Sequence, residues 1–327
     1  MKSSESHKNI STNTSSTCLV IGGRGFIGLH LIDALLQQDY HVRCFDRPHA
    51  VPLENKLRNN PNFEMFEGDF TNEKDIVDAF KGCDFCFHLV STTLPQSSNA
   101  DPVYDVESNV VATIKLFNHA VRTGLKKIIF PSSGGTVYGV PLNIPIHEDH
   151  PTNPLCSYGI SKLTIEKYLE LYRHLHGLEY SVLRISNPYG ERQRVHSSQG
   201  VIAVFLGKIL RGEVVEIWGD GSVTRDYIYI ADVIEAMLAT LAYSGDQRIF
   251  NIGSGQGHSL NEILDTIETV TGSPVHRRYL PGRPFDVPSN VLNIERARQY
   301  LDWSPGMSFE QGLSRFVKWL QQQPDDR

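Results

Sequence analysis

The chain has 327 residues, of which 40% are hydrophobic and 21% charged, a composition typical of a soluble globular protein and not of a disordered one. Its formal net charge is -6 and it has no long basic run, so nucleic acid is not an expected partner. No apolar stretch approaches the roughly 18 residues that a membrane span requires.

Residues 1–17 are rich in Ser, Thr and Asn and have no apolar core like that of a secretory signal, so we expect a disordered tail. The five cysteines are odd in number and widely spaced, which argues against a disulfide framework. Cys83 and Cys86 lie at the apolar run 85–90, which favours core packing over a redox or metal site. We therefore expect no metal, and free thiols predict a reducing cytoplasm as the compartment.

The first predicted element is a short buried strand over residues 18–21, which runs directly into a glycine-rich turn. Gly22, Gly25 and Gly28 are three residues apart, and apolar residues follow at helical spacing over 26–37. This order suits a diphosphate, because glycines permit a tight turn, close approach of the ligand and close packing of helix on strand. The first N–H groups of the helix would face the phosphates. Glycine spacing alone is also compatible with an ordinary turn.

The next predicted strand, residues 40–45, ends in Asp46, eighteen residues beyond Gly28. An acidic side chain at this place accepts hydrogen bonds from an adenosine ribose. A carboxylate would also repel a 2′-phosphate, so the pattern favours NAD over NADP. Arg47 leaves the alternative open, since a neighbouring guanidinium is able to hold that phosphate.

Short apolar runs and helical patterns continue to alternate as far as residue 186. We predict further strands at 63–67, 85–90, 127–132 and 180–185, and helices at 73–80, 103–123 and 157–176. This alternation predicts an α/β protein with a Rossmann doubly wound parallel sheet. Ligands of such sheets bind at the carboxyl ends of the strands. The polar residues that follow the strands are Asp69, which could meet the adenine edge, then Ser91, Ser132, Ser133 and Asn187.

After residue 187, Gly and Pro become frequent and the predicted elements are shorter. Helical patterns lie at 199–211, 231–243, 259–271 and 308–321. We expect residues 18–186 to form the dinucleotide-binding domain and 187–327 a smaller α+β substrate-binding portion. A segment near 228–253 is expected to return to the first domain.

The predicted helix 157–176 carries Tyr158 and Lys162, which share a face because they are four residues apart. A free phenol has a pKa of about 10 and is a poor base at neutral pH. A neighbouring ammonium, and a nicotinamide cation nearby, would favour the phenolate and bring it into working range. By itself this spacing is also compatible with an incidental Tyr and Lys on a surface helix.

Together, three features resemble the extended short-chain dehydrogenase/reductase family: the glycine loop, the Ser132-Ser133 pair before Tyr138-Gly139, and Tyr158-x-x-x-Lys162. Within it, the chain is most similar to UDP-galactose 4-epimerases and related nucleotide-sugar epimerases. The resemblance runs from about residue 18 to about residue 320. Further matches are Glu-Ser-Asn-Val-Val-Ala-Thr around Asn109, Asn187-Pro-Tyr-Gly, Trp218-Gly-Asp-Gly-Ser-Val-Thr-Arg-Asp-Tyr-Ile and Pro281-Gly-Arg-Pro-Phe-Asp-Val.

The resemblance implies a 4-epimerase with tightly held NAD. In such a mechanism Tyr158 takes the proton of the sugar 4-hydroxyl while the C4 hydride passes to NAD; the 4-keto sugar turns, and the hydride returns to its other face. Ser133 would bond the 4-oxygen, and Lys162 would tune Tyr158 and hold the nicotinamide ribose. The implied cofactor-binding set is Gly22, Gly25, Phe26, Ile27, Gly28, Asp46, Asp69, Phe70, Leu89, Ser91, Asn109, Ser132, Tyr158 and Lys162.

The implied partner is a nucleotide-diphosphate sugar. The guanidinium groups of Arg225 and Arg283 would each donate paired N–H bonds to its diphosphate. A surface salt bridge is the alternative for each arginine, but the surrounding motifs favour the diphosphate. The resemblance also implies a homodimer, in which helices 103–123 and 157–176 pair with their symmetry mates as a four-helix bundle. Asp286 would accept from a ribose hydroxyl, and Asn290 aligns with the family residue that limits the space around the sugar 2-substituent. The implied substrate-binding set is Ser133, Tyr158, Asn187, Arg225, Arg283, Asp286 and Asn290.

Two departures from the family pattern bear on the chemistry. The usual serine position holds Gly134, so we assign its role to Ser133 and keep Ser132 in reserve. Where dehydratases carry an Asp-Glu pair, this chain has Gly135 and Thr136, so we do not expect elimination of water. The sugar stays open between UDP-glucose/UDP-galactose and the N-acetylhexosamine forms. A nucleotide-4-keto-sugar reductase using NAD(P)H and a non-catalytic dinucleotide sensor are the alternatives.

Overall fold

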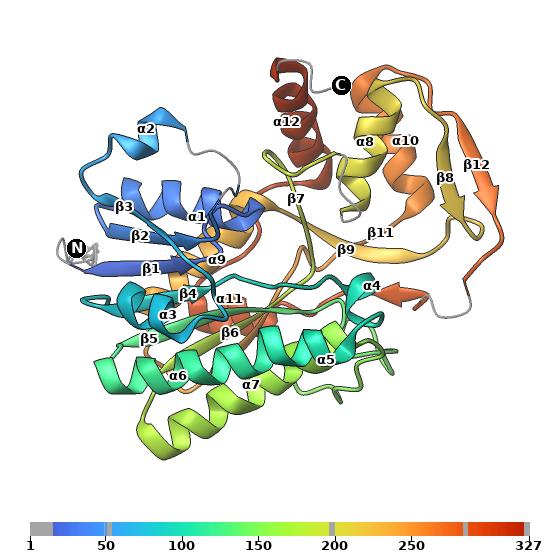
Figure 1. The fold of residues 1–327 in the computed structure, drawn as a ribbon. Helices are drawn as coiled ribbons and strands as arrows, with labels where there is room; N and C mark the ends of the chain where they lie inside the picture. Colours follow the sequence, from blue (N-terminus) through green and yellow to red (C-terminus); the bar gives the residue numbers. More distant parts are fainter. Residues whose placement is uncertain (1–15, 49, 51–53, 196–199, 284–286, 324–327) are drawn as a thin grey trace, which may run out of the picture.

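The computed structural model describes residues 16–48, 50, 54–195, 200–283 and 287–323. Its centre is a sheet of seven parallel strands in the order β10-β6-β5-β4-β1-β2-β3 (Figure 1). This is the predicted doubly wound α/β fold, and the prediction is confirmed. The strands are β1 (Thr17–Ile21), β2 (His41–Asp46), β3 (Phe63–Glu67), β4 (Phe85–His88), β5 (Lys127–Ser133), β6 (Tyr180–Ile185) and β10 (Ile249–Ile252).

The first strand begins at Thr17, within the segment expected to be a tail, and Thr17 pairs with His41 of β2. The rest of that expected tail, residues 1–15, lies outside the described residues. β10 comes from the segment expected to return to the first domain. It lies at one edge of the central sheet, where Phe250 pairs with Leu183 of β6.

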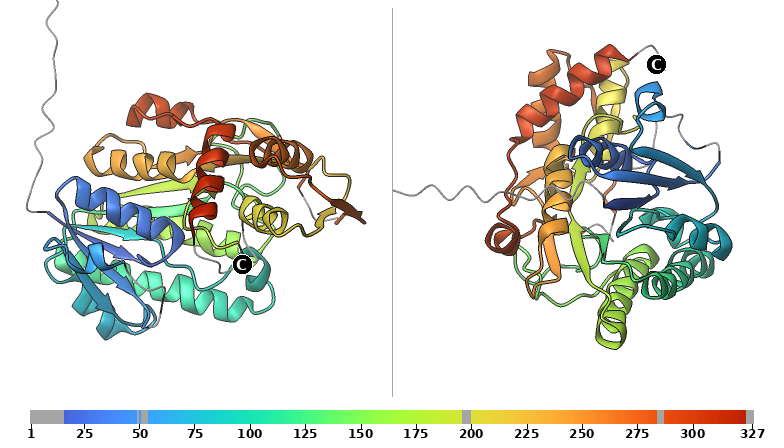
Figure 2. Two further views of the ribbon diagram at one scale, coloured as in Figure 1. Left: turned by 90° about the horizontal axis from the view of Figure 1, so that it is seen from above. Right: turned by 90° about the vertical axis from the view of Figure 1, so that its left-hand side faces the viewer.

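Helices cover both faces of the sheet because the buried strands are apolar on both sides. Cys18 and Val20 of β1 belong to a core that includes Leu31 of the first helix. Leu19 and Ile21 point into a second core on the opposite face. One face is covered by α1 (Phe26–Gln37) and α9 (Ile230–Ala242), and the other by α3 (Glu73–Phe80), α6 (Ala112–Thr123) and α7 (Ser157–His176) (Figure 2).

The segment predicted as one helix over 103–123 is divided into three. It comprises α5 (Pro102–Asp105), a six-residue π-helix, η1 (Val106–Val111), and then α6. The amide of Asn109 donates to the backbone carbonyl of Asp105 at 3.0 Å, so a side chain occupies an acceptor that the regular helix would use. Such π segments widen a helix locally, and here the widened turn carries Asn109.

The C-terminal portion packs beside the carboxyl ends of the central strands (Figure 1). β9 (Thr224–Tyr229) pairs with β7 (Asn187–Tyr189), β11 (Gly257–Ser259) and β13 (Ser289–Asn290). β8 (Val215–Trp218) and β12 (Arg277–Leu280) form a separate ribbon. The remaining helices are α2 (Asn55–Arg58), α4 (Pro95–Ser98), α8 (Val201–Leu210), α10 (Leu260–Thr271), α11 (Glu295–Leu301) and α12 (Phe309–Gln322).

This arrangement fixes where a ligand can bind. β1 and β4 are neighbours at the point where the strand order reverses, and the loops after them diverge there. In the part of the chain that the structure describes, no helix combines the length and apolarity needed to cross a membrane.

Candidate active site

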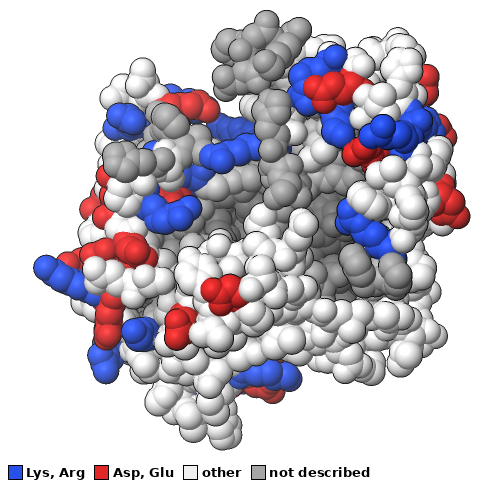
Figure 3. Space-filling view, turned by 45° about the vertical axis from the view of Figure 1, so that its right-hand side comes forward, with Lys and Arg blue, Asp and Glu red and all other residues white. Residues whose placement is uncertain are grey.

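A cavity of about 680 Å³ lies at the carboxyl ends of the central strands and extends to the C-terminal portion. The molecular surface is visibly hollowed between these two parts (Figure 3). The cavity brings together most of the site residues predicted from the sequence. Those that line it are Gly22, Gly25, Phe26, Ile27, Gly28, Leu89, Ser91, Ser132, Ser133, Tyr158, Lys162, Asn187 and Arg225.

The glycine turn forms one end of this cavity. Gly22 has φ +79°, and a Cβ on it would lie 2.9 Å from the Val90 nitrogen. A Cβ on Gly28 would lie 2.6 Å from the Gly23 Cα, so only glycine allows α1 to pack this closely on β1. The N-cap of α1 is Gly25, which offers no side-chain cap to the first N–H groups. The turn therefore fits a dinucleotide diphosphate.

Asp46 ends β2 beside this turn. Its Oδ2 accepts the backbone N–H of Arg24 at 2.8 Å, and its Oδ1 accepts that of Arg47 at 2.8 Å. The Arg24 guanidinium binds Glu67 at 3.1 Å and the Ala50 carbonyl at 2.5 Å, so it adds a cation that sequence reasoning missed. The anchored carboxylate fits the adenosine ribose, as expected of an NAD site.

Tyr158 and Lys162 lie on one wall of the cavity, both on α7. The Lys162 Nζ donates to the Pro131 carbonyl at 3.0 Å and lies 5.6 Å from the centre of the Tyr158 ring. Burial lowers the pKa of Lys162 to about 8. Burial also raises the pKa of Tyr158 to about 12, and the charges of Cys156 and Asp105 add to that rise. The polypeptide alone therefore keeps the phenol protonated, and the cationic nicotinamide would have to supply the opposing effect.

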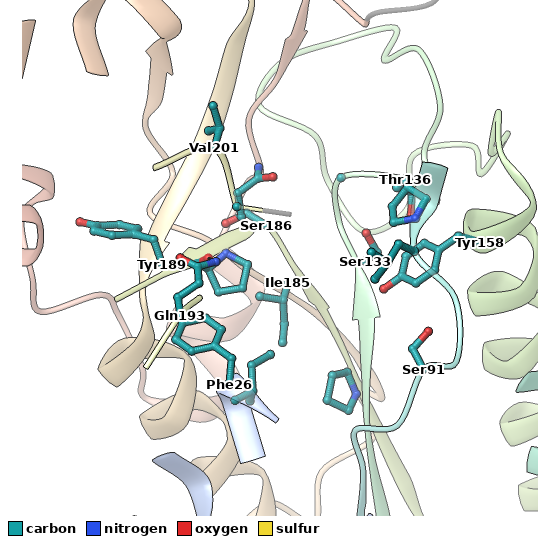
Figure 4. Close-up of a pocket in the computed structure, with 18 of the residues that line it drawn as sticks. Phe26, Ser91, Ser133, Thr136, Tyr158, Ile185, Ser186, Tyr189, Gln193 and Val201 are labelled. Atoms are coloured by element: carbon teal, nitrogen blue, oxygen red, sulfur yellow. The ribbon is translucent and has the colours of Figure 1, made fainter. Parts of the chain in front are cut away.

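The two serines that end β5, Ser132 and Ser133, differ in their surroundings. The Ser132 hydroxyl donates to the buried carboxylate of Glu166, so this reserve candidate is already engaged. Ser133 lines the cavity near Tyr158, with Thr136 beside it (Figure 4). The Thr136 Oγ1 is buried and has no hydrogen-bond partner among the described residues. Ser133 and Thr136 are thus the hydroxyls placed to meet a substrate oxygen.

The opposite wall comes mainly from the C-terminal half of the chain. Tyr189, Gln193 and Val201 lie there, across the cavity from Tyr158 (Figure 4). The Asn187 amide donates to the Asp226 carbonyl at 2.8 Å, and Arg225 lines the same region. Sequence reasoning missed Tyr189, Gln193 and Val201, because only the folding of β7 and α8 over the strand ends brings them to the cavity.

The other predicted residues lie away from the lining. Asn109 is buried behind Tyr158, and its Oδ1 accepts the Thr92 N–H at 3.0 Å. Phe70 packs on His88, with ring centroids 5.1 Å apart, and Asp69 is exposed and accepts from Thr71. The guanidinium of Arg283 stacks on Trp218 at 4.2 Å.

Asn290, expected to limit the space around the sugar 2-substituent, is buried and donates to the Gly134 carbonyl at 3.1 Å. In this position it does not line the cavity, and its Oδ1 is unpartnered among the described residues. Asp286, the expected partner of a ribose hydroxyl, lies outside the described residues.

The site combines a Rossmann sheet, a glycine cradle (Gly22, Gly25 and Gly28), an acid at the end of β2 and a Tyr/Lys pair at the strand ends. Together these features define a dinucleotide-dependent enzyme. The family model "NAD dependent epimerase/dehydratase family" matches residues 18–253, and the chain belongs to this family. Its cofactor is NAD. The resemblance predicted from the motifs is therefore confirmed.

Individual relatives agree with this assignment. The chain is 38% identical over 304 residues to a putative UDP-glucose 4-epimerase of Methanocaldococcus jannaschii, covering 92% of this chain and 97% of that one. It is 35% identical to a dTDP-4-dehydro-6-deoxyglucose reductase of Escherichia coli, with 92% and 96% covered. The crystal structure of a Thermotoga maritima UDP-glucose 4-epimerase with UDP-glucose superposes with a TM-score of 0.88 at 35% identity, covering 93% and 98%.

Proposed function

We propose that this protein is a nucleotide-sugar 4-epimerase that acts on UDP-glucose and UDP-galactose or on their N-acetylhexosamine forms. The observation that carries the proposal is a single cavity in which the glycine cradle, Ser133 and the phenol of Tyr158 all meet. A relative that binds UDP-glucose, with a TM-score of 0.88, supports the substrate class.

When bound beside Tyr158, NAD would supply the hydride acceptor and donor for C4 of the sugar. Tyr158 takes the proton of the 4-hydroxyl and gives it back. Ser133, with Thr136 beside it, hydrogen-bonds the 4-oxygen as its charge changes. Lys162, held by the Pro131 carbonyl, faces the cavity and would hold the nicotinamide ribose, while the positive charge that favours the phenolate of Tyr158 would come from the nicotinamide.

The remaining roles follow from position. We propose that the glycine turn and Asp46 hold the dinucleotide, and that Asn187 and Arg225, which line the cavity, bind the diphosphate of the sugar nucleotide. Arg283, which follows β12, is proposed to contact the same nucleotide, and Asp286 is proposed to accept from its ribose hydroxyl. Gly135 and Thr136 provide no acid/base pair, so elimination of water is not expected of this cavity.

The test is to incubate the purified protein with UDP-glucose and no added cofactor and to follow the anomeric protons by NMR. We expect conversion to the 4-epimer, with the ratio of the two sugars reaching equilibrium. A panel with UDP-galactose, both UDP-N-acetylhexosamines and the uronic acids then identifies the sugar. No conversion without added cofactor, combined with oxidation of one NADPH per turnover of a 4-keto sugar, would show the reductase instead, the activity of the relative from Escherichia coli.

We also propose a homodimer formed through α5, η1 and α7, which pack together. Several large apolar side chains are exposed on these helices, between 41% and 67%: Val103, Tyr104, Val106, Val111, Ile160, Leu171 and Leu175. Several exposed apolar side chains on helices that pack together are typical of a face that another copy covers.

Leu171→Asp is expected to convert the dimer into a monomer of 36.8 kDa, because it places a charge in the apolar contact. Light scattering after gel filtration measures the mass. Leu142→Asp, at a side chain that is 75% exposed and belongs to none of these helices, is the matched control and should leave the dimer intact. A parent protein that already runs as a monomer would rule the dimer out.

The cytoplasm remains the proposed compartment. All five cysteines are described, and each is a free thiol, four of them buried. Burial raises the pKa of the Cys44 thiol to about 12, which keeps this sulfur protonated and unreactive.

A further inference from the structure

Asp105, the last residue of α5, is a fully buried carboxylate that the sequence did not point to. Its Oδ2 accepts the hydroxyls of Ser157 at 2.8 Å and Ser161 at 2.6 Å. Its Oδ1 accepts the amide of Asn109 at 3.1 Å and the hydroxyl of Thr93. Four uncharged donors therefore satisfy an ion that would otherwise be costly to bury.

These donors come from three segments that meet at the site. Thr93 follows β4, Asn109 lies in the π-helix, and Ser157 and Ser161 flank Tyr158 on α7. Both serines reach the same oxygen of Asp105, so the first turn of α7 is held at two points. Because Tyr158 lies between these two serines on α7, the same contacts fix its position.

The cluster adjoins the reacting groups directly. A small cavity of about 10 Å³, with room for about one water molecule, is lined by Asp105, Asn109, Tyr158, Ser161 and Lys162 among others. The ammonium of Lys162 donates to the Pro131 carbonyl, and among the described residues it forms no ion pair with Asp105. The carboxylate is therefore a negative charge next to the phenol, held by dipoles and not neutralised by an ion pair.

The charged and titratable groups around this pair come from several elements. Tyr158 faces the thiol of Cys156 and the carboxylate of Asp105, and both raise its pKa in addition to burial. Around Lys162, Glu166 of α7 and Asp105 raise its pKa against the larger lowering by burial. His88 of β4 also faces Lys162, and burial lowers the pKa of this imidazole to about 3, so it is neutral.

We propose that Asp105 is a positioning residue, which ties the first turn of α7 to the π-helix and to the loop after β4 and so fixes Tyr158 over the cavity. The proposal rests on the proposed function for the role of Tyr158. A second consequence follows from its charge. Asp105 disfavours the phenolate and favours the ammonium, so it shifts both titrations toward higher pH.

The test is Asp105→Asn, which keeps the shape and removes the charge. Both the acid limb and the alkaline limb of the kcat–pH profile should move to lower pH, by roughly half a unit to one unit. The Tyr158 phenol is also titrated by absorbance at 295 nm, as the difference between each protein and its Tyr158→Phe counterpart, with NAD present. The midpoint of this titration should also move to lower pH. Because the measurement does not require turnover, it tests the proposal independently of the epimerase activity.

Ser157→Ala is the matched variant, because it removes one bond to Asp105 and leaves the charge. It should lower kcat several-fold with KM unchanged, while both pH limbs stay in place. It also serves if Asp105→Asn does not fold. The proposal is overturned if Asp105→Asn folds with unchanged phenol titration and unchanged pH limbs, or if Ser157→Ala keeps the kcat of the parent protein. Absence of turnover in the parent protein would instead contradict the proposed function.

Discussion

Tyr158→Phe is expected to reduce kcat for interconversion of the UDP-sugars by about 10³-fold, within the range for loss of a general acid–base group. The phenol oxygen is the group placed to exchange a proton with the sugar, and phenylalanine keeps the ring while removing that oxygen. NAD binding should persist, because the glycine cradle and Asp46 are unchanged. Turnover is measured by NMR, and bound NAD by absorbance after denaturation.

Tyr168→Phe provides the control, since it makes the same change ten residues further along α7, on a partly buried side chain of the core. It should keep the kcat of the parent protein to within about twofold. If Tyr158→Phe retains most of the activity, the proton must be taken by another group, and the mechanism built on this phenol fails.

Glu166→Gln is expected to lower the free energy of unfolding by about 3 kcal/mol, because it breaks a buried ion pair from one side. Glu166 and Arg184 are 2.7 Å apart, with side chains 2% and 4% exposed. Arg184 also donates to the Tyr138 hydroxyl at 3.0 Å. Removing the carboxylate charge leaves the guanidinium buried without a counter-ion. Denaturation by urea, followed by circular dichroism, gives the change.

Glu170→Gln is the comparison on the same helix, where Glu170 pairs with Lys167 at 3.4 Å and both side chains are about two-thirds exposed. Surface pairs of this kind contribute less than about 1 kcal/mol. If both variants lose the same free energy of unfolding, burial does not make the Glu166–Arg184 pair more stabilising than an exposed pair. Glu166 also accepts the Ser132 hydroxyl, so Glu166→Gln could lower activity through the site as well as through unfolding. The folded fraction is therefore measured before any loss of activity is interpreted.

Local sequence signals were sufficient for the sheet and for one end of the cavity. The apolar runs predicted β1 to β6 in position, and the glycine spacing predicted the cradle, because both depend on neighbours in the chain. The Tyr158/Lys162 pair follows from helical geometry alone. These features depend only on the spacing of apolar residues and on the glycine turn, so they are recognisable in a single sequence.

Other features depend on contacts between distant segments. Glu166 and Arg184 belong to different elements, and nothing in either neighbourhood indicates that they meet in the core. Asp105 resembles any polar residue at the end of a short helix until Ser157 and Ser161 are placed against it. The hydrogen bond from Ser132 to Glu166 is likewise a result of packing. It favours Ser133 over Ser132 as the serine that contacts the substrate, a choice that the motif left open.

The edge strand β10 has a consequence for how the chain is made. The central sheet is completed by residues 249–252, which are synthesised after β7, α8 and β9, the elements that line the far wall of the cavity. On the ribosome, the nascent Rossmann half cannot reach its final form until that late strand has emerged. A fragment that stops near residue 186 would expose the open edge of β6, so cutting the gene there should yield an aggregating product in place of a minimal cofactor-binding module.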